Sequence, residues 1–137
     1  MITIESDKSD IDDKLWDLCS LFWRLFYSDI NGFGRCYTCT KRVYYKEAHC
    51  GHYISRAYKA VKFHKDNLRY QCSQCNRWKG GQPIVFRENL VDEIGEKRVL
   101  AIEKQKDDSH PTKEWMLAEI PKYKQKIKLI PVKALNL

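Results

Sequence analysis

Two Cys-x-x-Cys pairs constrain the fold of this chain more than any other feature of its 137 residues. The pairs are Cys36/Cys39 and Cys72/Cys75, and a pair with this spacing folds into a short turn that directs both thiolates at one ion. Four thiolates suit tetrahedral Zn²⁺, so we predict a structural zinc ion bound by all four cysteines. Four-cysteine zinc sites usually separate their pairs by about 15 to 20 residues. The stretch 40–71 is longer, which indicates that it carries chemistry of its own.

Length predicts one domain, 1–137. The helices and short strands expected below give it an α+β class, with an N-terminal helix within 1–34, a zinc-bound core at 35–81 and a helical C-terminal region at 82–137. No apolar run approaches the roughly 18 residues that a membrane span needs. The acidic N-terminus lacks the basic and apolar regions of a signal peptide. We therefore expect a cytoplasmic protein with no membrane partner, in which reduced thiols favour metal binding over disulfides.

Positive charge is concentrated around the cysteine pairs. The net charge of the chain is +7, yet residues 35–80 contain eleven Lys/Arg and only two Asp/Glu, whereas residues 1–34 sum to −4. Such segregation favours a polyanionic partner, because each phosphate contact releases condensed counterions. We therefore predict nucleic-acid binding, with Trp78 and Tyr58 either stacking on unpaired bases or packing in the core. The predicted phosphate contacts are Arg42, Arg56, Lys59, Lys62, Lys65, Arg77 and Lys79.

Apolar periodicity predicts a helix over 9–29 whose wide apolar face must pack against the zinc core or against another subunit. Short strands are expected at 43–45 and 52–54, and a helical start at 75–79. Further helices are expected at 84–94, at 96–106 and after Thr112, with Pro121 bending or restarting the last one. The basic tail that follows is either a solvated surface or a DNA contact, and consists of Lys122, Lys124, Lys126, Lys128 and Lys133.

Three polar residues between and beside the cysteine pairs form a candidate catalytic series. His52 suits a general base, because the pKa of histidine lies near neutral pH. Asn76 directly follows the last cysteine and offers a neutral oxygen to Mg²⁺, which takes few protein ligands. Asn67 can hold the loop near His52 through hydrogen bonds from its side chain to the backbone. A base and a cation are what phosphodiester hydrolysis requires.

This pattern resembles the HNH, or ββα-metal, endonucleases, and more narrowly the NinG/Rap recombination endonucleases of lambdoid phages. The matching stretches span roughly residues 33 to 128 and read CYTC, GHYISR, FHKDNLRYQCSQCN and FRENLVDEIGEKRVLAIE, followed by a helix with Tyr123. The resemblance implies a zinc-bound ββα-metal (HNH) core with flanking N- and C-terminal helices. It also implies a structure-selective endonuclease that cuts branched DNA, including Holliday junctions and D-loops, as a phage protein in the bacterial host cell.

Carried over by position, the resemblance implies roles for the candidate residues. His52 would be the general base, Asn76 the ligand of catalytic Mg²⁺ or Mn²⁺, and Asn67 an orienting residue, while the four cysteines hold zinc. Many HNH proteins place an aspartate before the base histidine, and this chain has Gly51 there. Our first model is therefore Asn76 with water ligands. The alternative adds a second ligand from His49, Asp66 or Glu47.

Two other functions fit the sequence. One is a zinc-knuckle module that binds nucleic acid without catalysis, and the other is an HNH nuclease that cuts ordinary duplex DNA. Because symmetric junction cleavage needs two active sites, we predict a homodimer with the N-terminal helix as its candidate interface. Cys50 lies beside the candidate site, and its role is open between structural and functional.

Overall fold

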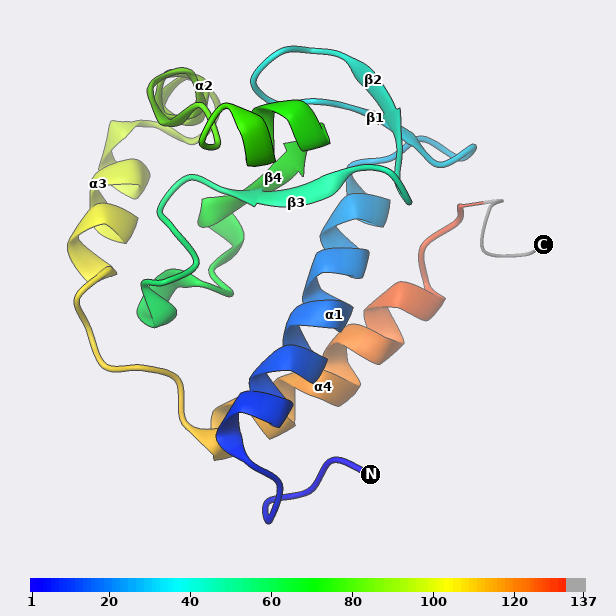
Figure 1. Ribbon diagram of the computed structural model, residues 1–137, viewed down its shortest axis with the longest axis vertical. Coiled ribbons are helices and arrows are strands. Elements are labelled where there is room, and N and C mark those ends of the chain that lie inside the picture. Colours follow the sequence, from blue (N-terminus) through cyan, green and yellow to red (C-terminus); the bar gives the residue numbers. More distant parts are fainter. Residues whose placement is uncertain (133–137) are drawn as a thin grey trace.

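The computed structural model describes residues 1–132 and shows helices packed around two small antiparallel sheets (Figure 1). The predicted α+β class is thereby confirmed. Lys133, the last residue of the predicted basic tail, lies outside the described residues. The helices are α1 Lys8–Phe26, α2 Pro83–Ile94, α3 Glu96–Gln105 and α4 Lys113–Lys128. The strands are β1 Phe33–Arg35, β2 Arg42–Tyr44, β3 His49–His52 and β4 Leu68–Gln71.

The strands pair locally, β1 with β2 and β3 with β4. In the second sheet His49 lies opposite Gln71, and His52 lies opposite Leu68. The strand predicted at 52–54 is therefore misplaced: it runs over 49–52 and ends where the prediction began. Pairing with β4 decides its position, and no strand was predicted at β4. β1 was also not predicted, because Gly32 before it and Gly34 within it are typical of a turn.

The apolar face of α1 packs inside the chain. In Figure 1, α1 and α4 run side by side, and both contribute to one buried cluster. This cluster buries the apolar face of α1 within the chain, so that face is not free for a second subunit, while the homodimer and its interface on the N-terminal helix stay predictions. α4 continues through Pro121, so the expected restart is absent. The cluster includes Ile11, Leu15, Phe22, Met116, Ile120 and Tyr123.

Ion pairs attach α2 and α3 to the sheet and its loops. The Arg69 guanidinium is 3.1 Å from Glu93 of α2. Arg87 of α2 pairs with Glu103 of α3 at 2.8 Å, and Tyr53 donates its hydroxyl hydrogen to the same carboxylate. These contacts hold the end of α2 against β4 and hold α3 against the loop that follows β3.

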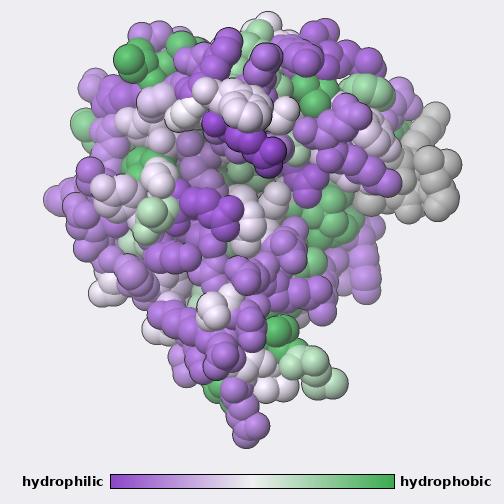
Figure 2. All heavy atoms as spheres, viewed as in Figure 1, coloured by the Kyte–Doolittle hydropathy of each residue, from purple (hydrophilic) through white to green (hydrophobic). Residues whose placement is uncertain are grey.

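No helix in residues 1–132 is long and apolar enough to cross a membrane. On the face shown in Figure 2, hydrophilic residues predominate and hydrophobic residues form small separate groups.

Candidate functional site: a four-cysteine cluster beside a basic pocket

The four predicted zinc ligands meet in space. Their Sγ atoms all lie within 4.8 Å of one another, and the Sγ atoms of Cys39 and Cys72 are 3.7 Å apart. Tetrahedral zinc with Zn–S bonds of about 2.3 Å separates its sulfurs by roughly 3.8 Å. The cluster predicted from Cys36, Cys39, Cys72 and Cys75 is confirmed, and its donor set and spacing fit zinc.

The second cysteine pair also positions Asn76. A π-helical turn, η3 (Gln74–Trp78), begins just after β4, and the backbone N–H of Asn76 donates to the Cys72 carbonyl at 3.1 Å. The Cys75 N–H points at the Cys72 sulfur, with an N···Sγ distance of 3.4 Å. A metal bound by these sulfurs would therefore fix the backbone that carries Asn76.

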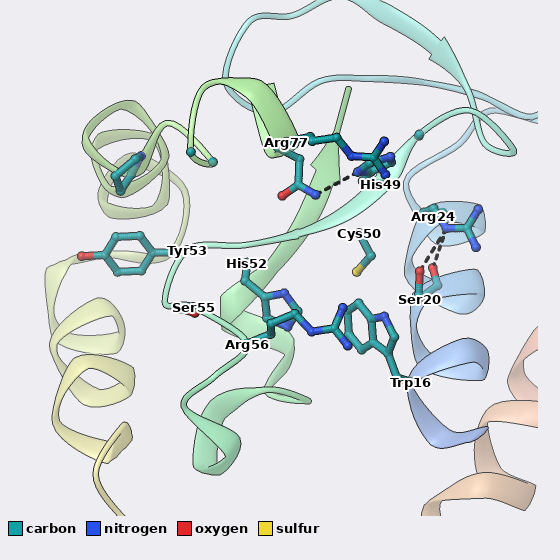
Figure 3. Close-up of a pocket in the computed structure, with 15 residues that line it drawn as sticks. Trp16, Ser20, Arg24, His49, Cys50, His52, Tyr53, Ser55, Arg56 and Arg77 are labelled. Atoms are coloured by element: carbon teal, nitrogen blue, oxygen red, sulfur yellow. Dashed lines mark hydrogen bonds between the residues drawn. The ribbon is translucent and has the colours of Figure 1, made fainter. Parts of the chain in front are cut away.

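An open pocket of about 880 Å³ lies between α1, β3 and the segment 76–83 (Figure 3). His52, His49 and Asn76 all line it, with His49 bound to Asn76 and with His52 on the opposite side of β3 from His49 (Figure 3). Three arginines from three different elements, Arg24, Arg56 and Arg77, also line it. Among the described residues that line the pocket, none is acidic. Its charge therefore favours an anionic ligand.

His52 is held in one tautomer and one orientation. Its Nε2 lies 2.9 Å from the Lys62 carbonyl, which can only accept, so Nε2 carries the hydrogen and Nδ1 keeps a lone pair. The Trp16 ring stacks on the imidazole with centroids 4.8 Å apart and planes 28° from parallel. Burial is the main cause that lowers the pKa of His52 to about 4. The hydrogen bond to Lys62 raises this pKa in part, and the positive charge of Arg56 lowers it further. His52 is thus neutral at pH 7 and able to accept a proton.

This depressed pKa predicts a pH-dependent stability. The unfolded chain protonates His52 near pH 6.5, whereas the folded chain resists protonation down to about pH 4. Because the unfolded state then binds more protons, the free energy of unfolding falls as pH decreases from 6.5 to 4, by about 3 kcal/mol from this group. Denaturant titrations of wild type and His52→Gln at several pH values measure this fall in the free energy of unfolding. Glutamine is the suitable replacement because it can still donate to the Lys62 carbonyl but does not titrate. Equal pH slopes in the two proteins, with exposed His110→Gln as control, would contradict the prediction.

His49 and Asn76 lie side by side. The Asn76 amide nitrogen is 2.9 Å from His49 Nδ1, as the dashed line in Figure 3 marks. Burial, followed by the charges of Arg77 and Arg24, lowers the pKa of His49, so Nδ1 of the neutral ring accepts this hydrogen bond. No other side-chain hydrogen bond of Asn76 occurs within residues 1–132, which leaves its Oδ1 for a cation or a water molecule.

Asn67 is fully buried and ties the loop after β3 to β4. Its Oδ1 accepts from the Ile54 N–H at 2.7 Å, and its Nδ2 donates to the carbonyls of Ile54 and Val61 at 3.0 and 3.1 Å. The backbone hydrogen bonds expected of Asn67 are present. They act on the loop that runs from His52 to Lys62, so Asn67 positions the site without lining the pocket. Its assignment as a catalytic residue stays a prediction.

The absence of a carboxylate at position 51 has a steric reason. A Cβ atom on Gly51 would lie 1.9 Å from Gln71 Oε1 and 2.6 Å from its Cδ. Gln71 cannot easily move, because it is fully buried and its Nε2 donates to Thr38 and to the Gly81 carbonyl. Within residues 1–132, its Oε1 is the one buried side-chain oxygen or nitrogen without a hydrogen-bond partner. Glutamine at 71 therefore excludes the aspartate found in many HNH proteins.

We expect Gly51→Ala to lower the free energy of unfolding by about 1–3 kcal/mol, because the added methyl overlaps a fixed side chain. Denaturant unfolding measures the change. In a Gln71→Ala background the same substitution should cost almost nothing, because the overlapping atoms are gone. An equal cost in both backgrounds would refute the steric explanation.

Several predicted site residues are placed elsewhere. Asp66 pairs with Arg98 at 2.5 Å and does not line the pocket, so it is not a second metal ligand in this fold. Glu47 is exposed in the turn before β3. Lys62 is only 1% exposed and its ammonium group pairs with Asp12, so the prediction that it contacts phosphate is wrong. His49 is the alternative ligand that the structure places beside Asn76.

The other predicted phosphate contacts are spread over the surface. Arg56 and Arg77 line the pocket, and Lys79 is exposed next to it. Arg42 instead stacks over Phe33, 3.8 Å from the ring centroid, and lines a different cavity. Lys59 pairs with Asp12 at 3.5 Å, and Lys65 is exposed on the loop before β4.

Sequence reasoning missed Trp16 and Arg24, which reach the pocket from α1. The one available signal was a lone arginine in an N-terminal segment that is otherwise acidic. Cys50 is buried in the cluster shared with α1 and α4, and burial raises the pKa of its thiol well above its usual range. Cys50 therefore packs in the core, and it also lines the pocket, so its role stays open.

Fold and site together define an α+β protein in which a zinc-type four-cysteine cluster adjoins a basic pocket containing two histidines and an asparagine. The family model described as "Bacteriophage Lambda NinG protein" matches residues 26–132, which is most of the chain. The chain belongs to the NinG family.

Relatives in this family share about a third of the aligned residues. Proteins named "Protein ninG" from Escherichia phage 933W and Enterobacteria phage VT2-Sa are each 34% identical over 79 residues. The protein of that name from Escherichia phage lambda is 33% identical over 83 residues. Each alignment covers 57% of this chain and 39% of the relative, so the chain spans about two fifths of the length of these curated relatives. No solved structure matches the chain.

Proposed function

We propose that this protein is a metal-dependent endonuclease of the HNH type that cuts branched DNA, such as Holliday junctions and D-loops, during phage recombination. The observation that carries the proposal is that His52, His49 and Asn76 line one pocket, which also holds three arginines and no acid among its described lining residues. Such a pocket contains a neutral histidine that can act as a base and a positive electrostatic potential that attracts phosphate.

The local architecture supports this assignment. The antiparallel pair β3–β4 is followed by the helical turn η3, which gives the order strand, strand, helix that an HNH core requires. His52 ends the first strand and Asn76 lies on the helical turn. The resemblance to HNH endonucleases assigns the base and the metal ligand to these two positions.

The residues present fit a weakly ligated catalytic metal. Asn76 offers an amide oxygen, and His49 orients it by accepting from Asn76 Nδ2; His49 itself could bind the ion only if that hydrogen bond broke. Mg²⁺ or Mn²⁺ commonly keeps several water ligands. When bound, the ion would stabilise negative charge on the phosphate and on the leaving oxygen. His52 Nδ1 would accept the proton of the attacking water, while Arg56 and Arg77 bind phosphate oxygens.

Recognition by DNA shape fits better than recognition by sequence. None of the helices in the described chain presents a row of Arg, Asn and Gln side chains at one-turn spacing, the arrangement that reads base edges in the major groove. Trp78 is 77% exposed on the turn between Asn76 and the pocket-lining Gly80, and is flanked by Arg77 and Lys79. An exposed aromatic ring between two cations suits an unpaired base at a branch point.

We expect Trp78→Ala to weaken binding of a junction with unpaired bases by about 1–3 kcal/mol, roughly 5- to 150-fold in Kd, without changing thermal stability. The dependence of Kd on salt should be unchanged, because tryptophan carries no charge. Fluorescence anisotropy at several salt concentrations measures both quantities. Ile84→Ala, a neighbouring residue 76% exposed, serves as the control. An unchanged Kd for Trp78→Ala would exclude base stacking there.

The function is tested by offering a synthetic four-way junction and a linear duplex of the same sequence, with Mg²⁺, Mn²⁺ or EDTA. Metal-dependent cleavage of the junction with little cleavage of the duplex supports the proposal. Equal cleavage of both would assign the nuclease to ordinary duplex DNA. Binding without cleavage under either metal would overturn the enzyme and leave a zinc-knuckle binding module. Light scattering during the assay tests the predicted homodimer.

A further inference from the structure

α1 reaches the candidate base through contacts that the matched family segment does not contain. That segment begins at residue 26, whereas α1 spans Lys8–Phe26. Two side chains of α1, Asp12 and Trp16, face the loop after β3. Asp12 forms a hydrogen-bonded ion pair with Lys62, and Trp16 stacks on His52.

We infer that Asp12 and Lys62 are positioning residues for His52, acting through the Lys62 carbonyl, and that α1 is thereby part of the active site. The inference rests on the proposed function for its catalytic consequence. The chain of contacts is short: the Asp12 carboxylate binds the Lys62 ammonium, and the carbonyl of the same residue accepts the hydrogen from His52 Nε2 at 2.9 Å.

The burial of Lys62 argues for a specific role. Lysine is rarely buried, yet this one is 1% exposed, and its ammonium lies 5.8 Å from the Trp16 ring centroid and 5.4 Å from that of Phe63. A buried ion pair contributes little to stability compared with apolar residues of the same shape. It does fix geometry, because the ammonium must stay on the carboxylate. Here it fixes the residue whose carbonyl selects the tautomer of His52.

The loop from β3 to β4 is held from two sides. Asn67 binds its inner side through the carbonyls of Ile54 and Val61. The outer side is bound to α1 through Lys62, with Lys59 adding a second contact to Asp12 at 3.5 Å. Without the α1 contact, Lys62 can rotate towards solvent and move its carbonyl. The imidazole would then lose the partner that keeps Nδ1 free for the attacking water.

Kinetics of variants at Lys62 and Asp12 distinguish a positioning role from direct binding of phosphate. If Lys62 bound phosphate, Lys62→Met would raise KM. If it positions His52, the same change lowers kcat by about tenfold to hundredfold with KM within twofold, as expected for a base displaced by about 1 Å. Asp12→Asn separates the two roles better than Lys62→Met, because removal of a negative charge near DNA should not weaken DNA binding. We expect it to lower kcat while KM stays equal or falls, and Asp12→Glu to restore part of kcat.

A second readout does not depend on activity. Two-bond ¹H–¹⁵N spectra of the zinc-loaded protein report the tautomer of His52, assigned by comparison with His52→Gln. Wild type should show hydrogen on Nε2, and Asp12→Asn and Lys62→Met should show a mixture of tautomers. The double variant Asp12→Asn/Lys62→Met removes both charges and should stay folded, yet show the same mixture.

The matched control is Arg98→Met, which breaks the Asp66–Arg98 pair elsewhere on the same loop. It should leave the tautomer unchanged and kcat within twofold. An unaltered tautomer in Asp12→Asn and Lys62→Met, or an effect of Lys62→Met on KM alone, would overturn the inference. If wild type cleaves no DNA, the proposed function fails, and the tautomer spectra alone decide whether Asp12 and Lys62 position His52.

Discussion

His52→Ala is expected to slow Mg²⁺-dependent cleavage of a four-way junction by about 10²- to 10⁴-fold, the usual contribution of a general base. The loss should appear in kcat, because the neutral imidazole contacts the attacking water more than the DNA. Single-turnover cleavage of a labelled junction measures it. Junction affinity and zinc content should stay at wild-type values, since the side chain lies outside the cysteine cluster.

The control for this experiment is His110→Ala, because His110 is exposed and does not line the pocket. His52→Gln adds a finer comparison: glutamine keeps a donor for the Lys62 carbonyl but supplies no base, so it should be as slow as alanine while more stable. Cleavage by His52→Ala at the wild-type rate would remove His52 from the mechanism. His49 would then be the remaining histidine in the pocket.

Cys72→Ser is expected to abolish zinc binding and to unfold the region around β4. Structural zinc contributes an apparent binding free energy of about 10–16 kcal/mol in zinc-finger peptides, and much of this is folding energy. Cys72 is 3% exposed and directly follows β4. Its Sγ atom is 3.7 Å from that of Cys39, so the loss of this thiolate affects both cysteine pairs. Metal analysis and circular dichroism measure the two effects.

Cys19→Ser provides the matched control, because Cys19 is equally buried but lies between α1 and α4, away from the cluster. It should keep its full zinc content and lose only packing energy. Chelation of wild type should reproduce the Cys72→Ser spectrum. A metal-free Cys72→Ser protein with wild-type stability would contradict a structural zinc site.

The sequence was most informative where chemistry depends on spacing along the chain. The zinc ligands were found from two short repeats, because a Cys-x-x-Cys turn is local. The helix bounded by Pro83 and Gly95 was found for the same reason, since its start and stop signals lie within the segment. His52 and Asn76 were selected by their position relative to the cysteines, and in the structure both line one pocket.

Charge alone was a poorer guide to individual contacts. Lys62 and Asp66 lie in the basic stretch and looked available, but both form ion pairs, with Asp12 and with Arg98. Each partner is more than 30 residues away in the sequence, so no local pattern reveals it. The same holds for β4, which became a strand only through its pairing with β3.

The cysteine pairs and the α+β class could be read from the amino-acid sequence, because they follow from local turns and local periodicity; His52 and Asn76 were selected by their positions next to the cysteines. Three features became visible only in the folded chain: which of those residues share a pocket, the supply of Trp16 and Arg24 to it by α1, and the lack of room beside Gln71 for a side chain at Gly51. These features depend on contacts between segments distant in the chain, and such contacts are set by the packing of the whole domain.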